Sequence, residues 1–151
     1  MRTPVPLPLW GWLLAGYLAV LALIGFWPTP VDAPAQGLLA DVFSRLHSAG
    51  VPGWFSYRTV EATANVLLFV PLGLAATLGL GSNWRQTVVL GALASACMEL
   101  GQLLFLQHRF PSLIDVATNT FGTLLGFLLA RTFMYRRNDV VVSLRRPSSR
   151  P

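Results

Sequence analysis

The chain is poor in charged residues, has one cysteine and contains no lysine. Charged side chains make up 11% of its 151 residues, and apolar side chains make up 54%. Soluble domains carry about 25% charged residues, so this composition excludes an ordinary water-soluble globule. The length suits one compact bundle rather than two domains. The single cysteine, Cys97, excludes a disulfide within one chain, and its apolar surroundings predict a small core residue.

The sequence motifs of common enzymes are also missing. No serine nucleophile motif, HExxH motif or phosphate-cradling loop occurs, and no residues stand at the fixed spacing of a metal site. We therefore expect no cofactor and no metal. All basic residues are arginines, and most of the basic excess lies in the tail after Arg131. That placement favours membrane topology over nucleic-acid binding, so no nucleic-acid partner is expected.

Four apolar runs are long enough to cross a bilayer. The first, residues 10–27, is uncharged and would form a helix about 27 Å long, with Trp10 and Trp27 at the two interfaces. This run is longer than the apolar region of a signal peptide, and only Arg2 precedes it. A retained span is therefore favoured over cleavage after Ala35. The other three runs cover residues 62–80, 87–106 and 113–133.

A shorter amphipathic segment lies between the first two runs. Its apolar residues recur at helical spacing from Leu38 to Leu46, which predicts a helix lying on the membrane surface. The expected fold is an all-α integral membrane protein, a four-span antiparallel helix bundle with an interfacial amphipathic helix between spans 1 and 2. Residues 1–135 would form this membrane domain. Residues 136–151 would form a basic cytoplasmic tail that is mostly disordered.

The placement of the arginines predicts the orientation of the bundle. With four spans, Arg45, Arg58 and Arg109 fall on one side, and the remaining arginines fall on the side of the two termini. The positive-inside rule then places the N- and C-termini in the cytoplasm.

Each of the last three spans carries a polar pair near the end that faces away from the cytoplasm. The members of a pair are three or four residues apart, so each pair occupies one helix face. Arg109 lies in the turn between the last two spans, where it is expected to pair with Glu99 or Asp115. Ionisable groups in hydrocarbon are costly, so their presence predicts a functional site. The predicted ligand-binding residues are Glu61, Asn65, Glu99, Gln102, Arg109, Asp115 and Asn119.

Small residues continue these faces beyond the polar pairs. Gly91 and Ser95 precede Glu99, and Gly122 and Gly126 form a GxxxG pattern in the last span. Because small residues let helix backbones approach closely, we expect the third and fourth spans to pack tightly.

Pro71 interrupts the second span. Proline lacks a backbone donor and predicts a kink, whose freed carbonyl could accept a bond from Gln102 or Asn119. A kink would also open the bundle on one side, which would give a lipid head group lateral access.

Three sequence blocks together resemble the VanZ-like family. They are Asn65-Val-Leu-Leu-Phe-Val-Pro71-Leu-Gly73, then Glu99-Leu-Gly-Gln102, then Arg109-Phe-Pro-Ser-Leu-Ile-Asp115-Val-Ala-Thr-Asn119-Thr-Phe-Gly122-Thr-Leu-Leu-Gly126. The resemblance implies a small multi-pass protein of the bacterial cytoplasmic (inner) membrane. The founding type of the family is linked to low-level resistance to the glycopeptide teicoplanin. The family has no settled reaction, so the resemblance implies a fold and a cell-envelope context.

The favoured function is that of a non-catalytic envelope protein. It would bind membrane lipids, in particular the head group of an anionic lipid or of a lipid-linked cell-wall precursor. Arg109 would contact the phosphate, and Asn65, Gln102 and Asn119 would donate hydrogen bonds.

Two alternatives remain open. The chain could be an intramembrane enzyme acting on a lipid head group, with Glu99 as the general base and Asp115 or His108 as its partner. It could also be a scaffold or partner subunit whose polar residues only bond across the bundle. The sequence does not indicate an oligomeric state.

Overall fold

The computed structural model describes residues 7–27, 36–106 and 111–145, and it describes side chains from Leu9 to Arg136 within these ranges. Five helices and no strand occur in the described part of the chain. The helices in chain order are α1 (Leu7–Gly25), α2 (Gln36–Ser48), α3 (Tyr57–Leu80), α4 (Trp84–Phe105) and α5 (Leu113–Arg145).

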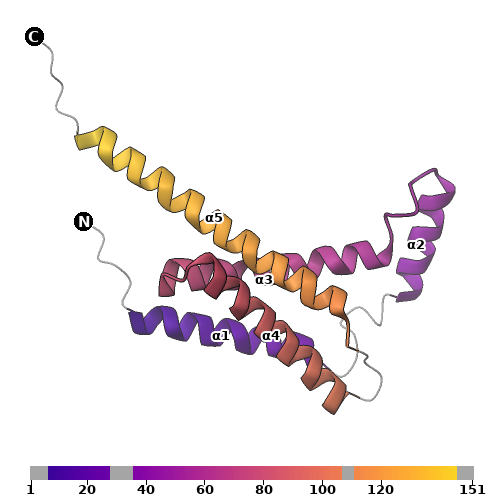
Figure 1. Ribbon diagram of the computed structural model, residues 1–151. Helices are drawn as coiled ribbons and strands as arrows, with labels where there is room; N and C mark the ends of the chain where they lie inside the picture. Colours follow the sequence, from indigo (N-terminus) through magenta and orange to yellow (C-terminus); the bar gives the residue numbers. More distant parts are fainter. Residues whose placement is uncertain (1–6, 28–35, 107–110, 146–151) are drawn as a thin grey trace, which may run out of the picture.

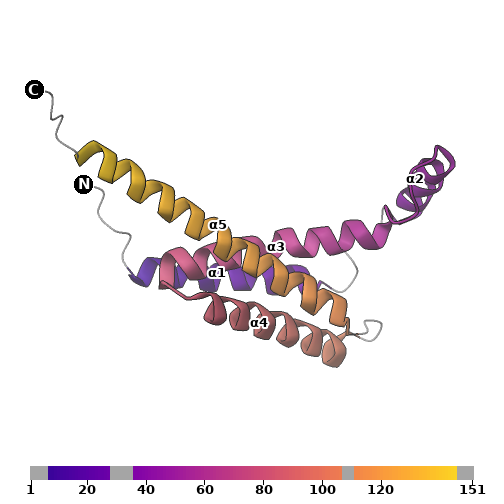
Figure 2. The same cartoon turned by 45° about the horizontal axis from the view of Figure 1, so that its top comes forward.

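The helices α3 and α5 form the centre of the bundle. They make the most extensive contact of any helix pair, α4 packs mainly on α5, and α1 packs mainly on α3. Figures 1 and 2 show that α3 and α5 run in the same direction, whereas α1 and α4 run the opposite way. The start of α1 and the distal part of α5 therefore lie at one end of the bundle, while α2 projects from the other.

Three helices are long and apolar enough to cross a membrane, namely α3, α4 and the segment Leu113–Arg136 of α5. The segment Leu9–Gly25 of α1 is a shorter apolar helix. These lengths confirm the prediction of an all-helical membrane protein, and the count of four spans stays a prediction. The expected disorder is wrong for residues 136–145, because α5 continues to Arg145, and residues 146–151 lie outside the described residues. The added stretch contains neither glycine nor proline, so nothing in it breaks a helix.

The outer surface of the bundle is apolar, and much of its interior is small and polar. Leu104 and Phe121 are more than half exposed, whereas Thr87, Ser95 and Thr123 are fully buried. Water would favour the reverse arrangement, and lipid favours this one because it solvates apolar side chains well. Cys97 is also exposed, so its prediction as a core residue is wrong.

Backbone contacts join α3 to α5 at glycine positions. A Cβ atom on Gly122 would collide with the carbonyl oxygen of Val66, and one on Gly126 would collide with that of Val70. The α3 residue Gly73 lies equally close to the backbone of Thr123. We call this contact, formed by Gly73, Gly122 and Gly126, the glycine seam.

The glycine seam corrects the expected partner of the GxxxG pattern. Its two glycines face α3, the second apolar run, and not α4 as the sequence suggested. The side chain of Thr123, one residue after Gly122, instead packs on Gly91 of α4. This segment of α5 thus packs on two helices, on α3 through Gly122 and on α4 through Thr123. Both contacts are possible because consecutive residues point about 100° apart around the helix.

Pro71 lies within α3, as the sequence predicts, and the kink itself stays a prediction. The neighbouring carbonyl of Leu68 accepts a hydrogen bond from the phenol of Tyr17 in α1. The expected bonds from Gln102 and Asn119 to this region do not form, because both amide groups donate elsewhere. A tyrosine on α1 therefore donates to a backbone carbonyl of α3 near the proline. The same bond joins α1 to α3.

The segment after α2 folds back onto that helix through aromatic side chains. The ring of Phe55 lies 5.8 Å from that of Phe43 in α2, centroid to centroid, and Trp54 contacts Phe55 edge-on at 6.2 Å. His47 is exposed and bonds the carbonyl of Phe55 through Nε2 at 3.0 Å. These contacts attach α2 to the start of α3, since α2 has little contact with the rest of the bundle.

Candidate functional site

Polar side chains from three helices gather where α4 ends and where α3 and α5 begin. We call this region, marked by Asn65, Glu99 and Asp115, the polar end. Its direct link between α3 and α5 runs from Asn65, whose Nδ2 donates to Oδ1 of Asp115 at 3.0 Å. Both residues are half-buried. The sequence places each of them on one face of its own helix, and the structure brings the two faces together.

A carboxylate of α4 binds the chain just before α5. Oε2 of Glu99 accepts the backbone N–H of Ser112 at 2.7 Å. The hydroxyl of Ser112 in turn accepts the backbone N–H of Asp115 at 3.2 Å, which caps the first turn of α5. An anion beside the start of a helix is favoured by the partial positive charge there. Glu99 therefore helps to fix where α5 begins.

The other two amides of the predicted set bond deeper in the bundle. Gln102 is buried, and its Nε2 donates to the carbonyl of Gly25 at the end of α1, at 2.8 Å. Asn119 is buried too, and its Nδ2 donates to Oγ of Ser95 on α4 at 2.9 Å. These bonds tie α4 to α1 and to α5. They lie next to the polar end but join helices rather than line its surface.

One buried acceptor in this region has no hydrogen-bond partner among the residues that the structure describes. This acceptor is Oδ1 of Asn119, which is inaccessible to solvent. Asn119 as a whole is 6% exposed. Buried polar atoms are nearly always satisfied, and an unsatisfied one costs about 1–3 kcal/mol. Because this oxygen is inaccessible, it belongs to the contact between α4 and α5 and not to the surface of the polar end.

The remaining predicted residues lie at the rim or outside the described residues. Glu61 is exposed on the first turns of α3, one turn before Asn65. Arg109 and His108 lie outside the described residues, so the expected pairing of Arg109 and the catalytic role of His108 stay predictions. The predicted set is thus divided. Asn65 and Asp115 meet, Glu99 holds the start of α5, and two amides bond within the bundle.

Sequence reasoning missed several partners that the structure shows. Ser112 stands three residues before Asp115, a spacing typical of a helix N-terminus. This cap could therefore have been predicted from the sequence. The roles of the Gly25 carbonyl and of the Tyr17 phenol could not have been predicted in this way. A backbone acceptor leaves no mark in a sequence, and a tyrosine in an apolar run is equally typical of a lipid-facing position.

The chemistry of the polar end is dominated by oxygen acceptors. Carboxyl groups of Glu61, Glu99 and Asp115 all belong to this part of the bundle. No group of three or more metal-ligating side chains occurs among the described residues. The two acid–base candidates, Glu99 and Asp115, each accept a bond from a different donor. Such a set suits recognition of a polar group that brings hydroxyl or amine donors.

Comparison with known proteins gives the family of the chain. The searches against curated proteins and against solved structures found no match. The family model described as VanZ/LLP1 matches residues 14–134, which include all described parts of α1 after Leu13, the whole of α2 to α4 and most of α5. This confirms the resemblance that the three sequence blocks suggested. The chain belongs to the VanZ/LLP1 family.

Proposed function

We propose that this VanZ-like membrane protein is a non-catalytic envelope protein whose polar end binds the head group of a membrane lipid or of a lipid-linked cell-wall precursor. The observation that carries the proposal is the convergence of Asn65, Glu99 and Asp115 from three helices at one end of an apolar bundle. Polar groups held at the end of a membrane helix bundle lie at the depth of lipid head groups, where such a ligand is available.

The ligand chemistry follows from the donors and acceptors. Carboxylates of Glu61, Glu99 and Asp115 give the polar end several oxygen acceptors. The carboxyl group of Asp115 accepts one hydrogen bond from Asn65, and its oxygens have room for further donors. A head group with hydroxyl or amine groups supplies the matching donors. The Arg109 guanidinium would hold an anionic phosphate of the same head group, as the sequence predicts.

The membrane topology belongs to the same proposal. We infer four spans, with α1 as the first, in the bacterial inner membrane, and both termini in the cytoplasm. The helix α1 has 19 residues, about 28 Å in length, and bonds to both α3 and α4 along its course. The arginines then place the polar end outside, with α2 lying on the outer interface.

A structural scaffold is the second candidate function. The bonds from Gln102 to Gly25 and from Asn119 to Ser95 join helices, and both amides are buried. Bonds of this kind stabilise membrane bundles by about 0.6 kcal/mol on average. For Gln102, a holding role fits the structure better than ligand contact. Under this division, Gln102 and Asn119 hold the helices together, whereas Asn65, Glu99 and Asp115 remain the candidates for ligand contact.

Ligand-induced thermal stabilisation separates the two candidates. The full chain is purified in detergent, and its unfolding temperature is measured with a soluble analogue of a lipid-linked wall precursor and with phosphatidylglycerol. The test variant is Asp115→Asn, which keeps an acceptor for Asn65 while removing the charge. We expect the wild type to be stabilised by the precursor analogue and the variant to lose at least about tenfold in affinity, since charged hydrogen bonds contribute about 1.5–3 kcal/mol.

The matched control is Asp41→Asn on the exposed surface of α2, which removes the same charge away from the cluster. It should bind as the wild type does. The proposal fails if the wild type shows no stabilisation with either ligand, or if the two variants respond alike. Ser95→Ala adds a third comparison, because it removes a helix-joining bond and should lower the basal unfolding temperature without changing the affinity.

A further inference from the structure

The opposite end of the bundle carries arginines and exposed aromatic rings. Arg85 lies at the start of α4, where its guanidinium is 5.3 Å from the ring centroid of Trp84. Arg131 and Arg136 lie on the distal part of α5. We call this region, marked by Arg85, Arg131 and Arg136, the basic end. The proposed function does not involve it.

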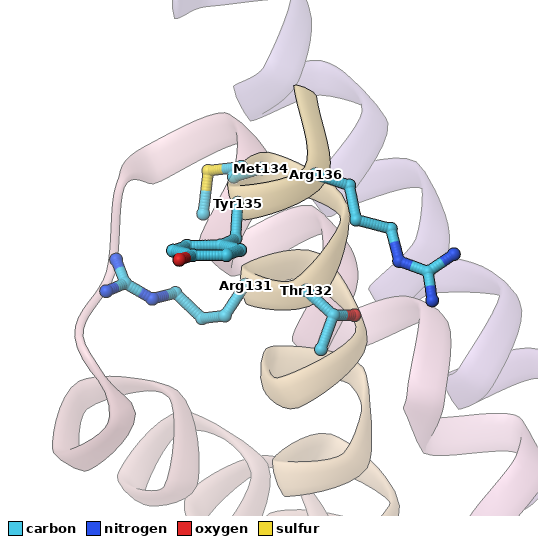
Figure 3. Close-up of a pocket in the computed structure, with 5 residues that line it drawn as sticks. All are labelled: Arg131, Thr132, Met134, Tyr135 and Arg136. Atoms are coloured by element: carbon cyan, nitrogen blue, oxygen red, sulfur yellow. The ribbon is translucent and has the colours of Figure 1, made fainter. Parts of the chain in front are cut away.

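An open hollow of about 510 Å³ lies against α5 at the basic end. The residues that line it are Arg131, Thr132, Met134, Tyr135 and Arg136. Figure 3 shows Arg131 and Tyr135 extending to one side of α5, with Thr132 and Arg136 on the other. Each of these pairs is four residues apart, so each places a guanidinium and a hydroxyl on one helix face.

The hollow lies at head-group depth. Arg131 follows Leu113, the first residue of α5, by 18 positions, or about 27 Å along the helix axis. The hydrocarbon core of a bilayer is about 30 Å thick, so a helix that begins at one surface brings Arg131 to the other. Trp84 and Tyr135 are exposed at the same end, and such rings prefer the membrane–water boundary.

Charge is divided unequally between the two ends. The acidic side chains that the structure describes, Asp41, Glu61, Glu99 and Asp115, all belong to α2 or to the polar-end portions of α3, α4 and α5. From Arg131 to Arg145, α5 contains four arginines and one acidic residue, Asp139, so this stretch has a net positive charge. An anion at this end therefore meets an excess of positive charge.

We propose that the hollow beside Arg131 and Tyr135 binds the phosphate group of an anionic phospholipid in the leaflet at that end, while Arg136 on the other side of α5 adds to the positive charge. A guanidinium offers two parallel N–H donors that match the oxygens of a phosphate. The hydroxyls of Tyr135 and Thr132 supply single donors on the same two faces. The thioether of Met134 and the ring of Tyr135 give apolar contact for the glycerol and the first acyl carbons.

Lipid binding by matched arginine variants tests the proposal. The full chain is reconstituted in nanodiscs or detergent, and retained lipid is counted by native mass spectrometry with phosphatidylglycerol or phosphatidylcholine present. We expect preferential retention of phosphatidylglycerol by the wild type. Arg131→Gln should lower its affinity about fivefold, and a double variant with Arg136→Gln should lower it further, since each arginine near an anionic surface contributes a factor of this size.

Arg58→Gln is the matched control, because it removes the same charge from an exposed arginine of α3 at the polar end. It should change the affinity less than twofold. Tyr135→Phe, which keeps the ring and removes the hydroxyl, should have a smaller effect than Arg131→Gln. Circular dichroism confirms that each variant is folded.

Inorganic phosphate distinguishes the source of the phosphate group. If millimolar phosphate stabilises the wild type but not Arg131→Gln, the phosphate site is supported, and competition with phosphatidylglycerol shows whether lipid occupies the same place. Equal retention of the two lipids by the wild type would overturn the proposal. So would an equal loss of phosphatidylglycerol in the Arg58→Gln and Arg131→Gln variants.

Discussion

The two ends of the bundle hold their polar residues in different ways. At the polar end, a bond such as Asn65 to Asp115 or Glu99 to Ser112 joins separate parts of the chain. At the basic end, the capping box of Asn83 and Gln86 is local, and Arg131 and Arg136 are exposed on one helix. Polar groups at the first end thus depend on the tertiary fold, whereas those at the second need only their own helix and the surrounding membrane.

This difference indicates where substitutions should propagate. A change at the polar end alters the relation between helices, and its effect should reach the whole bundle. A change at the basic end should remain local. The glycine seam lies between the two ends, and it brings the backbones of α3 and α5 into direct contact there.

The largest effect is expected from Gly126→Ala. The new methyl group would collide with the carbonyl oxygen of Val70 and lie 2.9 Å from the Cα atom of Gly73. We expect the free energy of unfolding to fall by about 3 kcal/mol, the upper part of the usual range for overpacking. Reversible unfolding in mixed micelles measures the change. Gly16→Ala on α1 is the control, because a Cβ there meets nothing within 4 Å. If both substitutions are tolerated equally, close backbone contact at the seam does not stabilise the pairing of α3 with α5.

A smaller effect on the whole bundle is expected from Ser95→Ala. The substitution leaves the amide of Asn119 without its acceptor, in addition to the oxygen that already has no partner. The expected loss of unfolding free energy is about 1–2 kcal/mol. In a background of Asn119→Leu the same change should cost much less, which a double-mutant cycle would reveal. Additive losses would mean that the Ser95–Asn119 bond does not couple α4 to α5.

The smallest of these effects is expected at the basic end, from Asn83→Ala. The side chain of Asn83 accepts the backbone N–H of Gln86 at 3.1 Å, and the backbone N–H of Asn83 donates to Oε1 of Gln86 at 3.0 Å. Loss of the cap should destabilise the start of α4 by about 1 kcal/mol. Hydrogen exchange should show faster opening of the first turn of α4 alone. Asn83→Asp retains the acceptor and should exchange as the wild type does. Faster exchange at the polar end would contradict the local character of this cap.

Sequence periodicity predicted the helices well because apolar length and charge exclusion are properties of single segments. The run 87–106 corresponds closely to α4, and 62–80 ends where α3 ends, at Leu80. The start of α3 lies earlier, at Tyr57, because Arg58 and Glu61 belong to the helix although they interrupt the apolar run. A charged residue thus indicates where an apolar run ends, but the helix can continue past it.

The candidate site was predicted only in part because spacing defines a face and not its neighbour. Asn65 and Asp115 were each placed on a polar face, and the structure pairs them. The spacing of Gln102 relative to Glu99 also suggested a shared site, yet Gln102 donates to α1. The GxxxG pattern signalled close packing, but it could not distinguish α3 from α4. The ligand-binding roles themselves stay predictions.

The parallel course of α3 and α5 has a consequence for biosynthesis. Two neighbours that run the same way need an intervening return helix, so α3 cannot reach its main partner until α4 and α5 have both entered the bilayer. Until then, the surface around Gly73 faces acyl chains or a chaperone. A ribosome-stalled chain that ends after α4 should therefore be more sensitive to quality-control proteases than the complete protein.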